Sequence, residues 1–192
     1  NILVVPSDKG GCGFYRSLEP HIYLDKLYGD EFNVEITYKP DYSNLASFDK
    51  YQIVHIHKGL CPDMRIFWMF LAYCKSKNIK VVLDFDDNWQ LNKDHPSYLA
   101  QVKQNYPLLL CTNIKNADYV TTTTDIFADK IKKVKGDNRV VVIPNAIDPE
   151  DKVVSAPKNK SSRLRIGLVM GSSHLKDVEQ LKGLTNMLKT VG

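Results

Sequence analysis

Residues 52–85 read QIVHIHKGLCPDMRIFWMFLAYCKSKNIKVVLDF, and this stretch decides the fold class. Short β-branched runs at 52–57 and 80–85 enclose a segment at 64–77 whose apolar residues recur at helical spacing. An apolar strand, a helix of ~10 or more residues and another apolar strand are typical of a parallel sheet covered on both faces. The apolar face of the predicted helix has four residues at helical spacing, namely Ile66, Met69, Phe70 and Tyr73.

The same alternation runs along the rest of the chain and predicts a doubly wound, mostly parallel α/β sheet. Further strands are expected at the apolar, β-branched runs 2–6, 33–38, 119–124, 139–144 and 164–170. Further helices are expected at 14–27, 108–116, 125–133 and 177–189. Two loops, at 39–49 and 88–107, carry no recognisable pattern.

The composition changes after Pro149, and this change suggests a domain boundary. Residues 1–150 are expected to form one domain, and the polar stretch 151–163 is expected to be a linker. Residues 164–192 then begin a second α/β unit with one strand and one helix, too short to fold alone. We expect this unit either to dock on the first domain or to belong to a longer protein.

The overall composition is that of a globular, water-soluble protein. Apolar residues make up 43% of the chain and charged residues 25%, with a net charge of +4. No apolar run approaches the ~18 residues that cross a bilayer, and the opening NILVV does not resemble a signal peptide. The mild, dispersed positive charge argues against a dedicated nucleic-acid binder. The four cysteines lack a CxxC pair, which favours reduced thiols and a cytoplasmic location.

Glycines follow the first predicted strand, in SDKGGCGFYR at 7–16. Gly10, Gly11 and Gly13 would let the backbone approach a ligand closely, and the next helix would point its first amides at an anion. The spacing is neither that of a dinucleotide-binding loop nor that of a P-loop. A phosphate loop with Arg16 nearby and a plain tight turn therefore both remain open.

Three carboxylates follow the strand at 80–85, since Asp84, Asp86 and Asp87 lie within four residues. They could hold Mg²⁺ or Mn²⁺, or Asp84 could lie in the strand while the other two cap a turn. We favour an acidic loop that faces a ligand, because no further acidic ligand has recognisable spacing. Trp89 is expected either to pack this loop down or to stack on a flat ligand.

Three further strand ends carry polar residues. His55 and His57 would share one face of a strand, but the chain offers too few other ligands at sensible spacing for a metal. His55 is expected to be a packed, hydrogen-bonded core residue, whereas His57 stands at the carboxyl end, where ligands bind in open α/β sheets. Asn145 follows the strand at 139–144 and favours a turn there. Thr124 or Asp125 is expected to cap the helix at 125–133.

The order of these motifs resembles that of family 4 and related retaining glycosyltransferases of the GT-B fold. A Gly-rich loop is followed by VHIH, DFDD, ADYVTTTT and VVVIPNAIDP, and then by a linker and a new strand. IPNAID corresponds to the family's I-P-N-G-V-D. The resemblance implies that residues 1–150 are the acceptor-binding, N-terminal Rossmann-like domain and that 164–192 begin the donor-binding domain.

The resemblance also implies roles for particular residues. Gly10, Gly11 and Gly13 match the loop that approaches the donor diphosphate, and His57 matches a histidine that contacts the transferred sugar. Lys176 matches a lysine near the phosphates, whereas Ser172 stands where an arginine is expected. The donor site is expected to include four more residues, namely Arg16, Asp86, Asp87 and Asn145. The family's E-x₇-E segment would lie beyond Gly192.

The expected reaction moves a sugar from UDP or GDP to a glycan or lipid-linked acceptor with retention. No metal and no other cofactor is expected, because helix N-termini and Lys or Arg suffice to stabilise a departing diphosphate. A bacterial polysaccharide pathway, in the cytoplasm at the inner face of the plasma membrane, fits this reading. This chain alone would be inactive. The alternatives are a noncatalytic α/β binding or partner module and, less favoured without G-x-G-x-x-G, a Rossmann dehydrogenase or epimerase.

Overall fold

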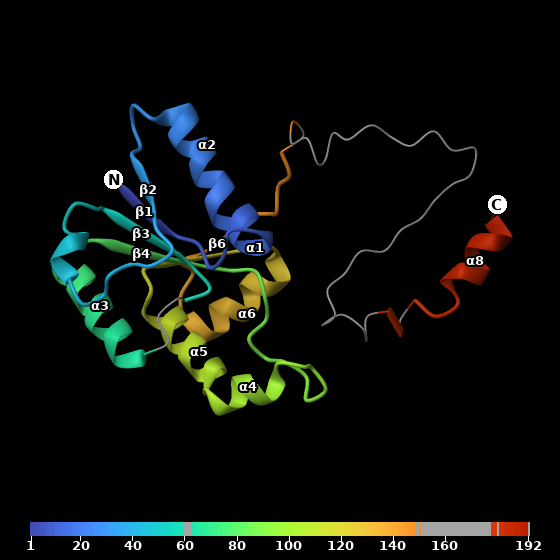
Figure 1. Ribbon diagram of the computed structural model, residues 1–192. Helices are drawn as coiled ribbons and strands as arrows, with labels where there is room; N and C mark the ends of the chain where they lie inside the picture. The colour runs from blue at the N-terminus through green and yellow to red at the C-terminus, as the bar shows by residue number, and fades with distance from the viewer. Residues whose placement is uncertain (60–62, 149, 151–177, 180, 192) are drawn as a thin grey trace.

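Six parallel strands form one sheet in the order β2-β1-β3-β4-β5-β6 (Figure 1). This computed structural model describes residues 1–59, 63–148, 150, 178–179 and 181–191. The strands are β1 (Ile2–Val5), β2 (Val34–Ile36), β3 (Ile53–His57), β4 (Lys80–Phe85), β5 (Tyr119–Thr122) and β6 (Val140–Val142). The predicted α/β fold with a mostly parallel sheet is therefore confirmed. The strand expected at 164–170 lies outside the described residues.

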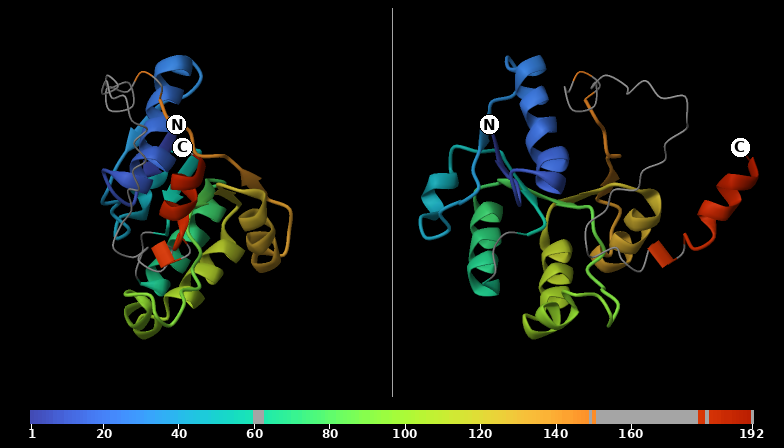
Figure 2. Two further views of the ribbon diagram at one scale, coloured as in Figure 1. Left: turned by 90° about the vertical axis from the view of Figure 1, so that its right-hand side faces the viewer. Right: turned by 45° about the vertical axis from the view of Figure 1, so that its right-hand side comes forward.

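Helices cover both faces of the sheet (Figures 1 and 2). One continuous helical segment covers the first face, and it comprises α1 (Gly11–Gly13), the π-helical turn η1 (Phe14–Leu18) and α2 (Glu19–Tyr28). The opposite face carries α3 (Met64–Ser76), α5 (Tyr106–Asn116) and α6 (Asp125–Lys135), with α4 (Tyr98–Lys103) beside α5. The remaining elements are the 3-10 turn η2 (Leu45–Phe48) and α8 (Leu184–Val191). The turn η2 and helix α4 occupy the two stretches that were expected to be loops.

The apolar face of α3 differs from the expected one. Phe67, Phe70 and Cys74 are buried against the sheet, whereas Ile66 is 40% and Met69 62% exposed. Helix α3 has apolar residues on all of its sides, so their spacing alone does not predict which side faces the core. The sheet decided it, because Phe67, Phe70 and Cys74 share one core cluster with the apolar residues of β3 and β4.

Local signals set the ends of two helices. Asp63 precedes α3 and accepts hydrogen bonds from the amides of Arg65 and Ile66. Thr124 caps α6 by accepting a hydrogen bond from the Phe127 amide, which confirms one of the two expected caps. Gly136, with φ of 81°, ends α6 in the left-handed conformation that favours glycine.

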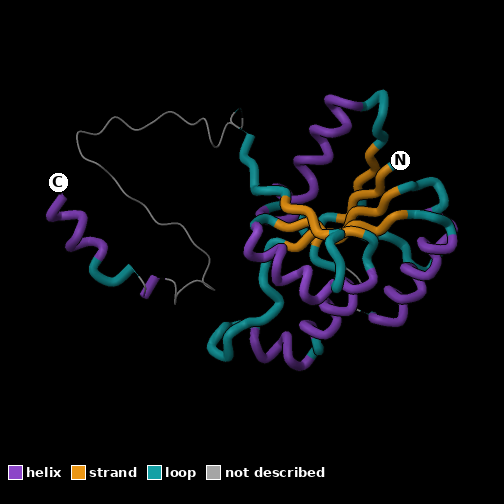
Figure 3. Tube along the Cα trace, turned by 180° about the vertical axis from the view of Figure 1, so that it is seen from behind, coloured by secondary structure: helices purple, strands orange, loops and turns teal. Residues whose placement is uncertain are grey.

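The strand order reverses direction at β1, which lies between β2 and β3. Ligands of open α/β sheets bind at such a switch point, outside the carboxyl ends of the strands. We call the carboxyl ends of β1, β3, β4, β5 and β6, with the loops that follow them, the carboxyl edge. Figure 3 shows the sheet from behind, between its two helical layers. Among the described residues, no helix is long and apolar enough to span a membrane.

Candidate functional site

The Gly-rich loop after β1 is organised by the side chain of Asp8. Its carboxylate accepts hydrogen bonds from the amides of Gly10, at 3.1 Å, and Gly13, at 3.2 Å. A Cβ on Gly13 would lie 2.5 Å from the Asp8 carbonyl oxygen, so no other residue fits without a shift. Gly11 has a φ of +51°, which L side chains rarely adopt. The loop's own geometry therefore requires Gly11 and Gly13.

Gly10 differs from these two glycines. Its φ of −137° is ordinary extended backbone, and a Cβ there would meet nothing within 4 Å. The fold alone therefore does not require glycine at this position. Gly10 leaves open space at the switch point between β1 and β3, where a ligand could approach the backbone.

Arg16 joins three strand ends through a buried ion pair. Its Nη2 and Nε donate to the Asp84 carboxylate at 2.5 and 3.0 Å, and both side chains are almost fully buried. Thr121 on β5 also donates to Asp84, at 2.5 Å. The Nη1 of Arg16 donates to the Ile143 carbonyl at 2.5 Å and to Asn145 Oδ1 at 3.3 Å. Asp84 thus lies within strand β4 and pairs with Arg16.

His57 connects the loop after β1 with the loop after β4. Its Nδ1 lies 2.7 Å from Ser7 Oγ, and its Nε2 lies 3.3 Å from Asp86 Oδ1. A carboxylate can only accept, so Nε2 carries a proton in this arrangement. The Ser7 hydroxyl then donates either to Nδ1 or to Asp8, whose Oδ2 is also 2.7 Å away.

The side chain of His57 is fully buried. Ser7, Asp84 and Asp86 surround the ring, with Asp84 Oδ2 at 3.8 Å from Nε2. A direct contact with a sugar therefore requires the atoms that cover the ring to move. The role of His57 in transfer stays a prediction, and its position at the carboxyl edge agrees with the expected one.

His55 has a different environment from His57. It is buried as expected, and its ring packs against that of His21 with 4.6 Å between centroids. Its Nδ1 has no hydrogen-bond partner among the described residues, so the expected hydrogen bond is missing at that atom. Burial lowers the pKa of His55, which keeps the ring neutral.

Lys58 was not recognised from the sequence. Its Nζ lies 3.1 Å from Asp86 and 2.7 Å from Asp87. Lys58 and Gly59 both have positive φ, of 61° and 65°, which is uncommon for lysine and is often found at functional sites. The one available signal was a cation and a glycine directly after a strand end.

Cys12, Asp86 and Asp87 could in principle bind a cation, because one ligand atom from each lies within 4.8 Å of the others. Burial and a hydrogen bond to Asp86 raise the pKa of Cys12 to about 11, so the thiol is protonated at neutral pH. Burial alone would raise the pKa of Asp86, but hydrogen bonds from His57 and Cys12 and the charge of Lys58 lower it. Lys58 thus already supplies a positive charge to these carboxylates.

A mainly apolar groove of about 480 Å³ lies between the start of α2 and the IPNAID segment. Tyr15, Pro20 and Tyr23 line one side, and Ala146 and Ile147 line the other. Tyr23 donates a hydrogen bond to Asp148, which ties IPNAID to α2. The groove also carries three carboxylates, those of Glu19, Asp148 and Glu150.

The structure brings most of the predicted site residues to the carboxyl edge. These are Gly10, Gly11, Gly13, Arg16, His57, Asp86, Asp87 and Asn145. Lys176 lies outside the described residues. Trp89 is 3% exposed and packs on Phe127, so it holds the acidic loop down. Cys12, Cys74 and Cys111 are free thiols.

These features define a Rossmann-like α/β domain with a candidate ligand site at its switch point. A sequence model of glycosyltransferase family 4 matches residues 5–151. This match covers more than half of the chain, from the last residue of β1 to beyond β6, and it includes the carboxyl edge, so the chain belongs to that family. No curated protein sequence matches the chain. The mostly parallel six-stranded sheet with flanking helices is consistent with the N-terminal domain of a GT-B glycosyltransferase.

Proposed function

We propose that this chain is the acceptor-side part of a retaining GT-B hexosyltransferase. The reaction moves a sugar from UDP or GDP to a glycan or lipid-linked acceptor without a metal. The family match over residues 5–151 carries the proposal. In this proposal residues 1–150 form the acceptor domain, 151–163 the linker and 164–192 the start of the donor domain. In this proposal the chain alone is inactive, because residues 164–192 supply only the first part of a donor domain.

The open space over Gly10 supports a donor phosphate at the switch point. Asp8 already occupies the amides of Gly10 and Gly13, so the phosphate uses the space rather than these two amides. Hydrogen bonds and charge from Asp87 and Asp86 outweigh burial and raise the pKa of Lys58, which is therefore charged at neutral pH. In this proposal Lys58 helps to stabilise the departing diphosphate, while Lys176 adds a second charge.

His57 acts in this proposal by positioning the loops around the donor. Its ring joins Ser7 after β1 to Asp86 after β4, and Asp86 in turn holds Lys58. Removal of the ring would free Asp86 and change where the Lys58 charge lies. Asn145 is held by Arg16 and remains exposed beside the IPNAID turn, where it could reach the donor.

The groove beside IPNAID is the proposed acceptor site. Tyr15 and Tyr23 offer aromatic surface on which sugar rings can pack, and the three carboxylates can accept hydrogen bonds from sugar hydroxyls. A bacterial enzyme of polysaccharide synthesis in the cytoplasm, at the inner face of the plasma membrane, would meet both substrates there.

The experiment compares Gly10→Ala with the wild type in the full protein that carries this chain. Titration calorimetry with UDP-glucose and GDP-mannose measures donor binding, and release of UDP or GDP measures turnover with a lipid extract as acceptor. Gly10→Ala should leave thermal unfolding unchanged and weaken donor binding by ~10-fold or more, because a methyl group would meet the donor. Lys58→Met should lower turnover more than Lys58→Arg does.

Four results would contradict the proposal. Absence of nucleotide-sugar binding in the full protein would favour a noncatalytic module. Unchanged donor affinity in Gly10→Ala would show that the donor phosphate does not bind against this loop. Loss of turnover in EDTA would contradict a metal-independent reaction, and an inverted anomeric configuration, read by NMR of the product, would contradict retention.

A further inference from the structure

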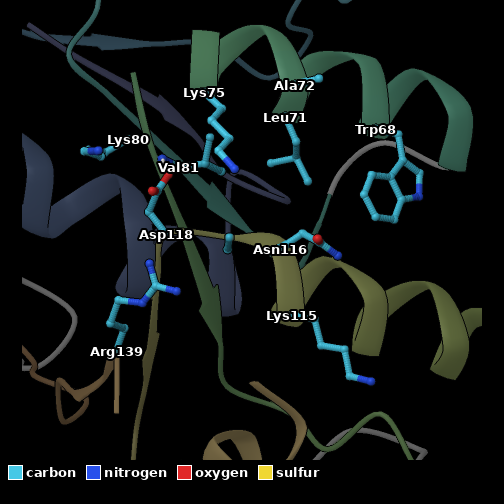
Figure 4. Close-up of a pocket in the computed structure, with 11 residues that line it drawn as sticks. Trp68, Leu71, Ala72, Lys75, Lys80, Val81, Lys115, Asn116, Asp118 and Arg139 are labelled. Carbon is cyan, nitrogen blue, oxygen red and sulfur yellow. Dashed lines mark hydrogen bonds between the residues drawn. The ribbon is translucent and has the colours of Figure 1, made fainter. Parts of the chain in front are cut away.

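A second cavity, of about 480 Å³, lies far from the carboxyl edge, between α3 and α5 (Figure 4). Its floor is made by Val81 and Ala117, where β4 and β5 begin. The cavity is therefore at the amino ends of the strands, whereas the proposed donor site is at their carboxyl ends. We call this cavity the α3–α5 groove.

One side of α3 lines the groove, with two apolar side chains followed by a lysine. Trp68, Leu71 and Lys75 follow one another at spacings of three and four residues, so they share one side of the helix. The indole of Trp68 hangs from α3 toward α5 in Figure 4 and is 46% exposed. A half-exposed tryptophan next to a cavity offers a large apolar surface that this chain leaves uncovered.

The groove is lined by more cations than carboxylates. Lys75, Lys80, Lys115 and Arg139 all line it, against the single carboxylate of Asp118. Asp118 Oδ2 accepts a hydrogen bond from the Val81 amide, and Arg139 pairs with Asp137 at 2.7 Å. The three lysines are exposed, and no carboxylate of the described residues forms an ion pair with them.

Lysines often stand at helix C-termini because they complement the negative end of the helix dipole. At the C-terminus of α5 another residue already has this role, because the buried Lys135 donates to the carbonyls of Ala117, at 2.7 Å, and Ile114. The end of α3 is capped by the amides of Lys77 and Ile79. Lys80 begins a strand. The positive charge of the groove is thus in excess of what the fold needs.

We propose that the α3–α5 groove binds the phosphate group of an anionic amphiphile, with Trp68 against its apolar part. A groove with an apolar wall and three lysines that form no ion pair within the described part of the chain is complementary to a phosphate ester attached to a hydrophobic group. An anionic phospholipid in a bilayer and a free amphiphilic phosphate share this chemistry. The inference rests on the groove alone and does not depend on the sugar-transfer reaction.

The experiment measures binding of the full chain to phosphatidylcholine vesicles with and without phosphatidylglycerol, by sedimentation and by tryptophan emission. The chain has two tryptophans, and the other one, Trp89, is only 3% exposed. Binding should therefore shift the emission of Trp68 to the blue, and Trp68→Phe should abolish the shift. Dihexanoyl phosphatidylglycerol as a monomer in solution tests the free molecule.

Charge reversal tests the cations. The double variant Lys75→Glu/Lys115→Glu should weaken binding by ~10-fold or more, because each lysine near an anionic surface adds attraction. The matched control Lys39→Glu/Lys133→Glu changes the net charge equally at exposed lysines outside the groove. It should bind nearly as well as the wild type.

Each outcome decides the proposal. Binding to vesicles but not to the monomer assigns the groove to a lipid surface, and binding to both assigns it to the individual headgroup. Binding to neither overturns the proposal. An equal loss in both double variants would show that net charge alone is responsible, and a Trp68 emission that does not change would place the contact elsewhere. Either of these last two results would also overturn the proposal.

Discussion

Charged side chains are arranged differently at the two ends of the strands, the carboxyl edge and the opposite side, where the strands begin, which we call the amino edge. At the carboxyl edge, Arg16 and Asp84 are buried and paired with each other, and the half-buried Asp86 is paired with His57 and Lys58. At the amino edge, the lysines of the α3–α5 groove are exposed and lack ion pairs in the part of the chain that the structure describes. Buried pairs fix geometry because breaking them is costly, whereas exposed cations are free to meet a ligand. The paired charges of the carboxyl edge hold side chains in fixed positions, whereas the exposed lysines of the amino edge are available to bind an anion.

The largest effect on stability is expected for Asp84→Asn at the carboxyl edge. The substitution leaves the Arg16 guanidinium buried without its counter-charge, so the free energy of unfolding should fall by about 3–5 kcal/mol in urea titrations. Glu35→Gln is the matched control, since its partner Lys50 is exposed and the pair is solvated. A loss at Asp84 no larger than the loss at Glu35 would break the comparison.

The Gly-rich loop gives the next effect. Gly13→Ala puts a methyl group 2.5 Å from a backbone oxygen, so unfolding should become easier by about 1–3 kcal/mol. Gly10→Ala meets no atom and should leave the midpoint of thermal unfolding unchanged. Equal midpoints for the two variants would mean that the loop adapts and that the carboxyl edge is less rigid than described.

Acid should weaken the carboxyl edge through Asp86. The hydrogen bonds and the Lys58 charge that outweigh burial lower the pKa of Asp86 in the folded state from its ordinary value of 3.8. Its contribution to stability is therefore present above pH 3.8 and is lost as the pH falls below that value. Urea titrations between pH 6 and pH 3 should show a flatter pH dependence for Asp86→Asn than for the wild type. Parallel curves would contradict this role.

The smallest effect is expected at the amino edge. Lys75→Gln/Lys115→Gln removes two exposed charges that form no ion pair with any described residue, so the free energy of unfolding should match that of the wild type at low and at high salt. A measurable loss would show that these lysines stabilise the fold, and the contrast between the two edges would then be weaker.

The elements of the sheet were predictable because each strand is a continuous apolar run. All six strands that the structure describes coincide with predicted ones, since a parallel sheet buried on both faces needs such runs. Local rules also found the Thr124 cap and the position of Asn145 after β6. The side of α3 that faces the core was predicted wrongly, because Met64, Ile66, Trp68 and Met69 make the exposed side of this helix apolar as well.

The partners within the site could not be predicted from the sequence. Arg16 and Asp84 are 68 positions apart, and only the strand order brings them together. The same holds for Lys58, whose importance depends on Asp86 and Asp87 from the neighbouring strand. The sequence indicated which loops form the site, whereas the pairing of charges depends on register and depth.

Arg16 has a consequence for protein engineering. Its guanidinium holds the carbonyl of Ile143, 127 positions further along the chain, and also the side chain of Asn145. The direction in which the chain leaves the sheet after β6 is thus set by the first turns after β1. A chimera that exchanges only the N-terminal helical segment would separate Arg16 from these partners. Residues 7–28 and 143–148 should therefore be exchanged together, as one inherited unit.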